Sequence, residues 1–134
     1  GNYIAVAPVP EDQTHQYGIV GVEDPKAKTS RITQMVEKPK AGTAPSNLHI
    51  SGRYILQPEI FEVLEKGERG TGGEIQITDA MIKLAKVQPF HAVRFDGTIY
   101  DCGSKIGFLT ANVAYALARS DLGPALKAEI KKLM

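Results

Sequence analysis

The chain has 134 residues, of which 43% are hydrophobic and 23% are charged, which is typical of one soluble globular domain. Its 16 Lys and Arg residues nearly balance its 15 Asp and Glu residues, so charge gives no reason to expect a nucleic-acid partner. Neither a bilayer-length apolar run nor a basic and apolar leader is visible, and the single cysteine, Cys102, rules out an internal disulfide. We therefore expect one domain over residues 1–134, cytoplasmic, and binding neither nucleic acid nor membrane.

Short β-branched segments bounded by prolines and polar turns predict strands in the first part of the chain. They cover residues 3–7, 17–23, 31–38 and 48–56. The polar residues 24–30 have the length of a hairpin connection between the second and third of these strands. Pro39 lacks an N–H group for the next ladder hydrogen bond, so the third strand is expected to end at Lys38.

Helical periodicity dominates the rest of the chain. It predicts helices from Pro58 to Gly67, over residues 77–87, over residues 106–117 with Ser104 as the N-cap, and over residues 122–134. Asp96 and Gly97 form a two-residue signal for a hairpin between residues 90–95 and 98–101. The elements together predict an α/β fold with a mixed sheet and flanking helices.

Motifs that bind phosphate or metal by themselves are missing from the sequence. It contains no G-x-x-x-x-G-K-[ST], G-x-G-x-x-G, H-E-x-x-H or C-x-x-C pattern. The histidines are scattered, and isolated histidines usually pack or cap rather than bind a ligand. The glycines of residues 67–73 could mimic a phosphate loop, but a flexible connection between two helices is the simpler explanation.

Five segments, in order and at their spacing, resemble the bacterial UTP–glucose-1-phosphate uridylyltransferases, also called UDP-glucose pyrophosphorylases. They are "YGIV", "VEKP", "APSNLHISGRYIL", "GGEIQITDA" and "YDCGSKIGFLTANVAYAL", and the resemblance extends over residues 3–118. The related thymidylyltransferases share "EKP" but typically have D-T-G where this chain has Asp101, Cys102 and Gly103. The resemblance implies the C-terminal part of a nucleotidyltransferase fold, which is Rossmann-like.

The family resemblance implies a reaction in which glucose 1-phosphate attacks the α-phosphorus of UTP, pyrophosphate leaves and UDP-glucose forms with the help of Mg²⁺. Such transfers depend on positioning and charge neutralisation. By resemblance, Glu37 binds glucose hydroxyls, and Lys38 binds the phosphates and is the catalytic residue. Adjacent strand residues point to opposite faces, so both reach one ligand only if the backbone leaves the ladder there. Pro39 favours that departure, although a solvated strand end would have the same tripeptide.

Three further positions match the family pattern. Gly18 has no side chain, so a sugar ring can approach its backbone. The backbone amide near Ile50 matches a sugar contact. Asp101 matches a carboxylate that binds Mg²⁺, and the predicted hairpin would put it at the end of the returning strand. An aspartate before glycine is otherwise a turn residue or a cap.

The chain departs from the family in what it lacks. The family's N-terminal half has a G-x-G-T-R phosphate loop, the uracil pocket and a first metal carboxylate, so this chain looks like the C-terminal half and is expected to be inactive alone. Loss of the neighbouring half should leave an unpaired sheet edge and bare apolar faces, which favour homo-oligomers. Two alternatives remain: a non-catalytic interaction or regulatory domain of the same fold, and half of a thymidylyl- or cytidylyltransferase.

Overall fold

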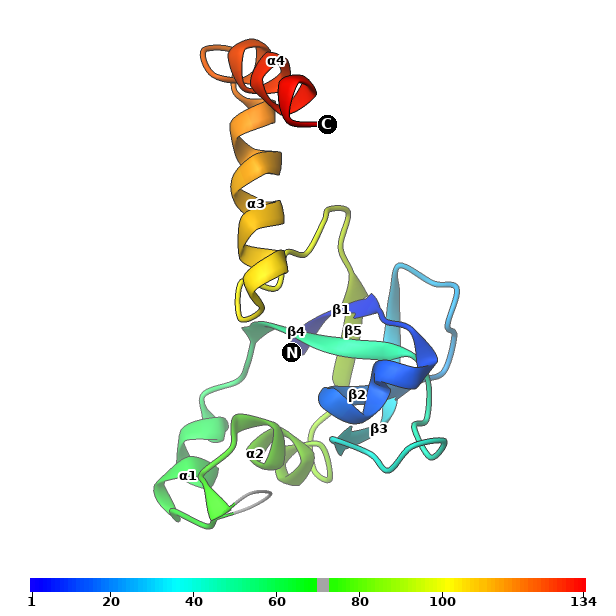
Figure 1. Cartoon of the computed structure of the whole chain (residues 1–134). Coiled ribbons are helices and arrows are strands. Elements are labelled where there is room, and N and C mark those ends of the chain that lie inside the picture. Colours follow the sequence, from blue (N-terminus) through cyan, green and yellow to red (C-terminus); the bar gives the residue numbers. More distant parts are fainter. Residues whose placement is uncertain (70–72) are drawn as a thin grey trace. The chain divides into compact units, whose positions relative to one another are not determined.

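The computed structural model describes residues 1–69 and 73–134, which divide into two compact units, Gly1–Phe95 and Asp96–Met134 (Figure 1). The elements described in the first unit are β1 (Asn2–Pro8), the 3-10 helix η1 (Glu11–Gln16), β2 (Gly18–Val22), β3 (Thr29–Glu37), β4 (Leu48–Ile55), α1 (Glu59–Glu65), α2 (Ile77–Leu84) and β5 (Phe90–Arg94). The second unit contains α3 (Lys105–Ala118) and α4 (Gly123–Leu133). The predicted strands and helices of the first unit are confirmed to within a few residues, except for η1, which was not predicted.

The five strands form one mixed sheet that closes on itself in the order β1-β4-β2-β3-β5. The β1–β5 pair is parallel and the other pairs are antiparallel. The prediction of a mixed sheet with flanking helices is therefore confirmed. The expectation of an unpaired sheet edge is wrong for this barrel, because each strand already has a neighbour on both sides.

The core of the first unit lies between the barrel and the two helices that follow β4. In β1 alternate residues are buried, as the period of two requires, whereas β2 is buried at three successive residues, Ile19, Val20 and Gly21. The buried cluster combines Ile4, Val6, Val20, Met35, Leu48, Phe90 and Ala92 from the strands with Ile60, Ala80, Met81 and Leu84 from α1 and α2. Burial of each large apolar side chain contributes about 1.5–3 kcal/mol. This packing fixes α2 beside β3, where the first turn of α2 approaches the strand ends.

The chain between α1 and α2 is the glycine-rich connection. Gly67 and Gly73 have positive φ angles of 61° and 77°, which favour glycine. Gly70 and Gly72, which belong to the same predicted connection, lie outside the described residues.

The predicted hairpin around Asp96 and Gly97 is wrong. β5 ends at Arg94, and residues 98–101 do not form a strand. Both edges of β5 are already occupied, by β1 on one side and β3 on the other. A returning strand would therefore have no free hydrogen-bonding edge to pair with, and the turn signal leads out of the barrel instead.

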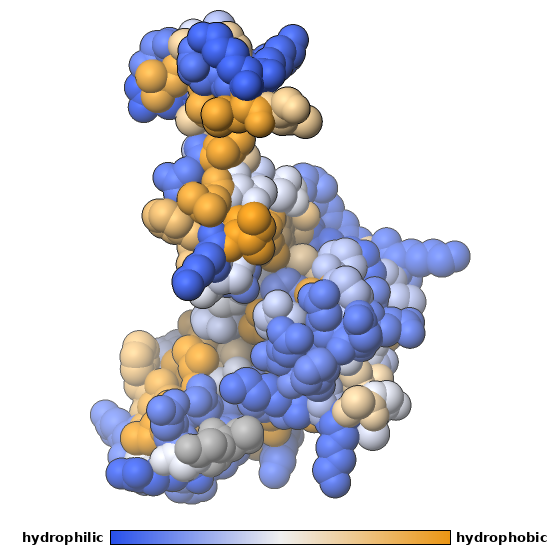
Figure 2. Space-filling model, viewed as in Figure 1, coloured by the Kyte–Doolittle hydropathy of each residue, from blue (hydrophilic) through white to orange (hydrophobic). Residues whose placement is uncertain are grey.

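The second unit consists of α3 packed on α4. The prediction that Ser104 is the N-cap is confirmed, since its Oγ accepts a hydrogen bond from the Gly107 N–H at 3.0 Å. Much of the apolar surface of α3 is exposed, and Figure 2 shows hydrophobic side chains gathered along this helix. In residues 1–69 and 73–134, no helix has the length and hydropathy needed to cross a bilayer.

A buried histidine lies on β4. His49 is only 8% exposed and packs against the ring of Tyr17, with 5.0 Å between the ring centroids. Its Nδ1 atom is buried, with no hydrogen-bond partner within the part of the chain that the structure describes. Burial lowers the pKa of His49 below its ordinary value of 6.5, and a backbone hydrogen bond with Ile50 opposes this only in part.

The lowered pKa of His49 predicts a loss of stability in acid. The unfolded chain takes up a proton on His49 as the pH falls through 6.5, whereas the folded chain resists it, so the free energy of unfolding decreases from there downward. Urea denaturation at pH 7.5 and pH 5.5 measures this difference. His49→Phe should reduce it, and the matched control His15→Gln, at an exposed histidine, should leave it unchanged. Equal pH dependence in wild type and His49→Phe would contradict the prediction.

Candidate functional site

The paired ends of β2 and β3 bring several predicted residues together. Gly18, the first residue of β2, lies opposite Glu37, the last residue of β3. A Cβ atom built on Gly18 would lie 2.9 Å from Glu37 Oε2 and 3.2 Å from Ile50 Cδ1. The absence of a side chain at Gly18 therefore lets the Glu37 carboxylate and the Ile50 methyl group pack closely against the Gly18 face of β2, in space that a Cβ atom would need.

Two further side chains of this cluster were not predicted. Thr78, buried in the first turn of α2, places its Cγ2 atom 3.5 Å from the same built Cβ position. Tyr54 on β4 is half-buried, and its pKa is raised by burial and then by the negative charge of Glu37. Its hydroxyl is thus kept protonated and available as a donor. Both residues lie in segments of the family resemblance, "GGEIQITDA" and "SGRYIL", and that is the sequence signal that could have indicated them.

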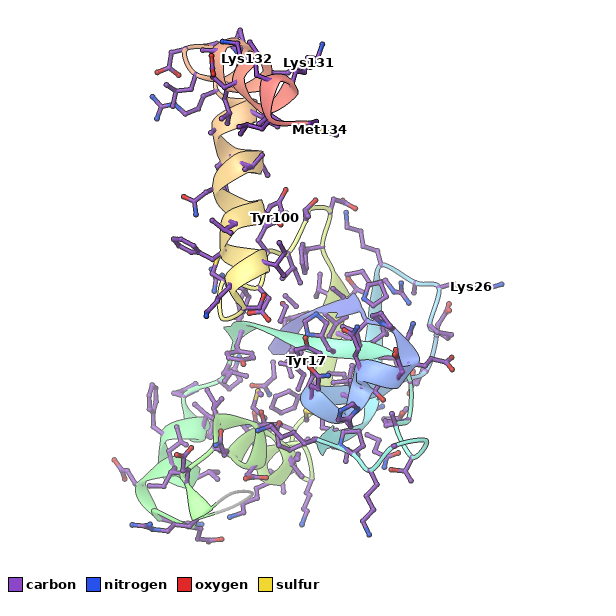
Figure 3. The ribbon with its side chains drawn as sticks, viewed as in Figure 1. Tyr17, Lys26, Tyr100, Lys131, Lys132 and Met134 are labelled. Atoms are coloured by element: carbon purple, nitrogen blue, oxygen red, sulfur yellow. The ribbon has the colours of Figure 1, made fainter. Side chains whose placement is uncertain are left out.

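Lys38 marks the point at which the third strand leaves the ladder. Its N–H donates to the carbonyl of Tyr17 at 3.1 Å, and Figure 3 labels Tyr17 in the barrel. The φ angle of Lys38 is 46°, in the left-handed region that a non-glycine residue occupies at a cost of about 1–2 kcal/mol. Lys38 is exposed and the following Pro39 is buried. The backbone thus turns at Lys38, and Glu37 and Lys38 are not held in the regular alternation of a strand.

Ile50 is half-buried in β4 and pairs with Val6 of β1. The prediction concerned its backbone amide, whereas the group that the structure brings to the Gly18 face is its Cδ1 methyl group. An apolar side chain next to a carboxylate suits a sugar ring, which has both C–H and O–H groups.

Asp101 lies in the second unit, in the turn that leads into α3. Its Oδ1 accepts a hydrogen bond from the Gly103 N–H at 2.9 Å, and its carbonyl accepts one from the Ser104 hydroxyl at 3.2 Å. The predicted position at a strand end is wrong, and Asp101 instead forms the turn that precedes the helix. Its exposed carboxylate is a hard oxygen ligand of the kind that Mg²⁺ prefers. Within residues 1–69 and 73–134, no group of three potential metal ligands is present.

Comparison with known proteins gives consistent matches. Residues 1–117 match the family described as nucleotidyl transferase. The UTP–glucose-1-phosphate uridylyltransferase of Staphylococcus epidermidis is 48% identical over 97% of this chain and 45% of its own length. A solved structure described as UTP-bound UGPase from Acinetobacter baumannii is 38% identical, with a TM-score of 0.88, over 100% of this chain and 46% of that one.

A second solved structure, described as UDP-glucose pyrophosphorylase complexed with UDP-glucose, is 42% identical with a TM-score of 0.80, over 88% of this chain and 45% of that one. The chain thus spans about half the length of the relatives it matches. The family match over residues 1–117 agrees with the mixed sheet and its flanking helices. The chain belongs to the nucleotidyl transferase family.

Proposed function

We propose that this chain provides the sugar-binding side of a uridylyltransferase site that makes UDP-glucose and pyrophosphate from UTP and glucose 1-phosphate. The observation that supports this most directly is the close approach of the Glu37 carboxylate and the Ile50 methyl group to the Gly18 face of β2. The names of the similar relatives and the description of the structure in complex with UDP-glucose indicate the same substrates.

Each side chain of the site has a task in this proposal. The Glu37 carboxylate accepts hydrogen bonds from glucose hydroxyls, and the missing side chain of Gly18 lets that carboxylate lie close to the backbone of β2. The Tyr54 hydroxyl, kept protonated, donates to Glu37 or to the sugar. The exposed ammonium of Lys38 lies on a backbone turned away from the strand and neutralises the phosphate of glucose 1-phosphate.

The reaction joins two phosphates that both carry negative charge. A phosphate oxygen of glucose 1-phosphate forms a bond to the α-phosphorus of UTP, and the bond to the pyrophosphate oxygen breaks. Asp101 is the residue that would hold Mg²⁺, and the ion when bound would neutralise charge on the phosphates. One carboxylate is a small share of the ligands that Mg²⁺ needs. We therefore propose that groups outside this chain complete the metal and nucleotide sites, and that the chain alone does not form UDP-glucose.

We also propose that the chain assembles as a homo-oligomer through α3. Four of its large apolar side chains recur at spacings of three and four residues, so they lie on one face, and each of the four is at least 38% exposed. They are Ile106, Leu109, Val113 and Leu117. An exposed apolar stripe of this length is typical of a helix that packs against another chain.

Gly18→Ala tests the proposed sugar site. The new methyl group would displace the Glu37 carboxylate, which is the movable end of a flexible side chain, so the fold should survive while the site changes. We expect at least about tenfold weaker binding of UDP-glucose, measured by ligand-observed NMR, because a charge-assisted hydrogen bond would be misplaced. The thermal midpoint serves as the control for folding. Unchanged binding in Gly18→Ala would contradict the proposed site.

A further inference from the structure

An apolar groove lies in the second unit, where the end of α3 meets the start of α4. It has a volume of about 800 Å³, and its apolar lining includes Leu117, Pro124 and Ile130. Lys127 and Lys131 also line it. The groove therefore combines an apolar floor with a cationic rim, and it plays no part in the proposed sugar site.

The two rim lysines lack counterions. Lys127 and Lys131 are exposed and one helical turn apart, and neither forms an ion pair within residues 1–69 and 73–134. Two other cations near the groove do form ion pairs: Arg119 pairs with Asp121, and Lys132 pairs with Glu129. Figure 3 labels Lys131 and Lys132 on α4. At this helical spacing the Cβ atoms of Lys127 and Lys131 are about 6 Å apart, so the rim presents two neighbouring ammonium groups to whatever fills the groove.

The first unit has a surface of opposite charge. On α1, Phe61 is 66% exposed, and Glu62 and Glu65 are exposed on the same side of the helix. Glu62 and Glu65 are three residues apart, so their carboxylates are also neighbours along the helix. In the part of the chain that the structure describes, neither glutamate forms an ion pair. One large apolar ring flanked by two carboxylates matches one apolar groove flanked by two ammonium groups.

We propose that α1 of a second copy of this chain docks in the α3–α4 groove, with Phe61 on the apolar floor and Glu62 and Glu65 against Lys127 and Lys131. Each chain has both surfaces, so two copies can make the contact reciprocally about a two-fold axis, or each copy can offer its groove to one neighbour and its α1 to another. Opposite charges at the rim fix the orientation of the docked helix, while the ring supplies the buried apolar area.

Disulfide cross-linking between two differently tagged copies tests this contact. Both copies have Cys102→Ser; one has Lys66→Cys, at the exposed end of α1 with Phe61 kept in place, and the other has Pro124→Cys. Mild oxidation should link them into a heterodimer. The matched control replaces Pro124→Cys with Asn112→Cys, an exposed position on α3 outside the groove lining, and should give about tenfold less product. Equal yields from the two pairs would overturn the proposal.

Charge reversal tests whether the rim lysines pair with the α1 glutamates. Lys127→Glu and Lys131→Glu in the groove copy should lower the yield about tenfold, and adding Glu62→Lys and Glu65→Lys to the other copy should restore it. Failure of the restored pair to cross-link would overturn the proposed charge pairing. If α1 instead occupies the groove of its own chain, a chain with both cysteines will close at monomer mass and the mixed copies will not cross-link. That result would overturn docking by a second copy.

Discussion

Glu37→Gln is expected to weaken the binding of UDP-glucose by about tenfold to a hundredfold. Hydrogen bonds to a charged group contribute about 1.5–3 kcal/mol, and glutamine keeps the size of the side chain while it removes the charge and one acceptor. The substitution therefore separates the chemistry of the carboxylate from its volume next to Gly18. Ligand-observed NMR or calorimetry with UDP-glucose measures the loss.

The matched control is Glu23→Gln, which removes an exposed carboxylate at the other end of the β2–β3 hairpin. It should leave binding unchanged. The pKa of Tyr54 gives a second readout: without the Glu37 charge it should fall toward its ordinary value of 10.0, yet stay raised by burial. Ultraviolet titration follows it. If the pKa of Tyr54 falls in Glu37→Gln as expected, but the variant binds UDP-glucose as strongly as wild type does, a sugar-binding role for Glu37 is contradicted.

The sequence predicted the site best where one local rule determined the backbone. Pro39 predicts the end of the third strand, and the structure ends β3 at Glu37 with a left-handed Lys38. Gly18 was predicted to leave space for a sugar ring; in the structure it lies opposite Glu37, whose carboxylate takes up part of that space. Thr78 could not be predicted in the same way, because only the packing of α2 beside β3 brings it to the Gly18 face.

Closure of the sheet into a barrel could not be predicted from local sequence rules. Asp96 and Gly97 have the sequence of a tight hairpin turn, and a turn signal predicts a returning strand only if an edge is free to pair with it. In the structure β1 and β3 occupy both edges of β5, and those partners come from distant parts of the chain. Asp101 was therefore predicted on a strand, whereas it precedes α3 and forms a turn with Gly103 and Ser104.

The turn at Asp101 depends on a glycine in the first turn of α3. A Cβ atom built on Gly107 would lie 2.0 Å from the Asp101 carbonyl oxygen and 2.6 Å from the Ser104 Oγ. The first contact is with the backbone, which cannot rotate away as a side chain can. Gly107 therefore allows the loop that contains Asp101 to fold closely over the start of the helix.

Gly107→Ala is accordingly expected to destabilise the chain by about 1–3 kcal/mol, the usual cost of forcing atoms into a filled space. In an ordinary helix the same substitution stabilises by about 0.5–1 kcal/mol, so the sign of the change distinguishes the close approach from helix propensity. Urea denaturation measures it, with Thr110→Ala as the control at an exposed position one turn further along α3. The control should be neutral or slightly stabilising. A Gly107→Ala chain that is more stable than wild type would show that the loop of Asp101 does not depend on this contact. The close approach at Gly107 would then no longer explain the position of Asp101, the proposed metal ligand.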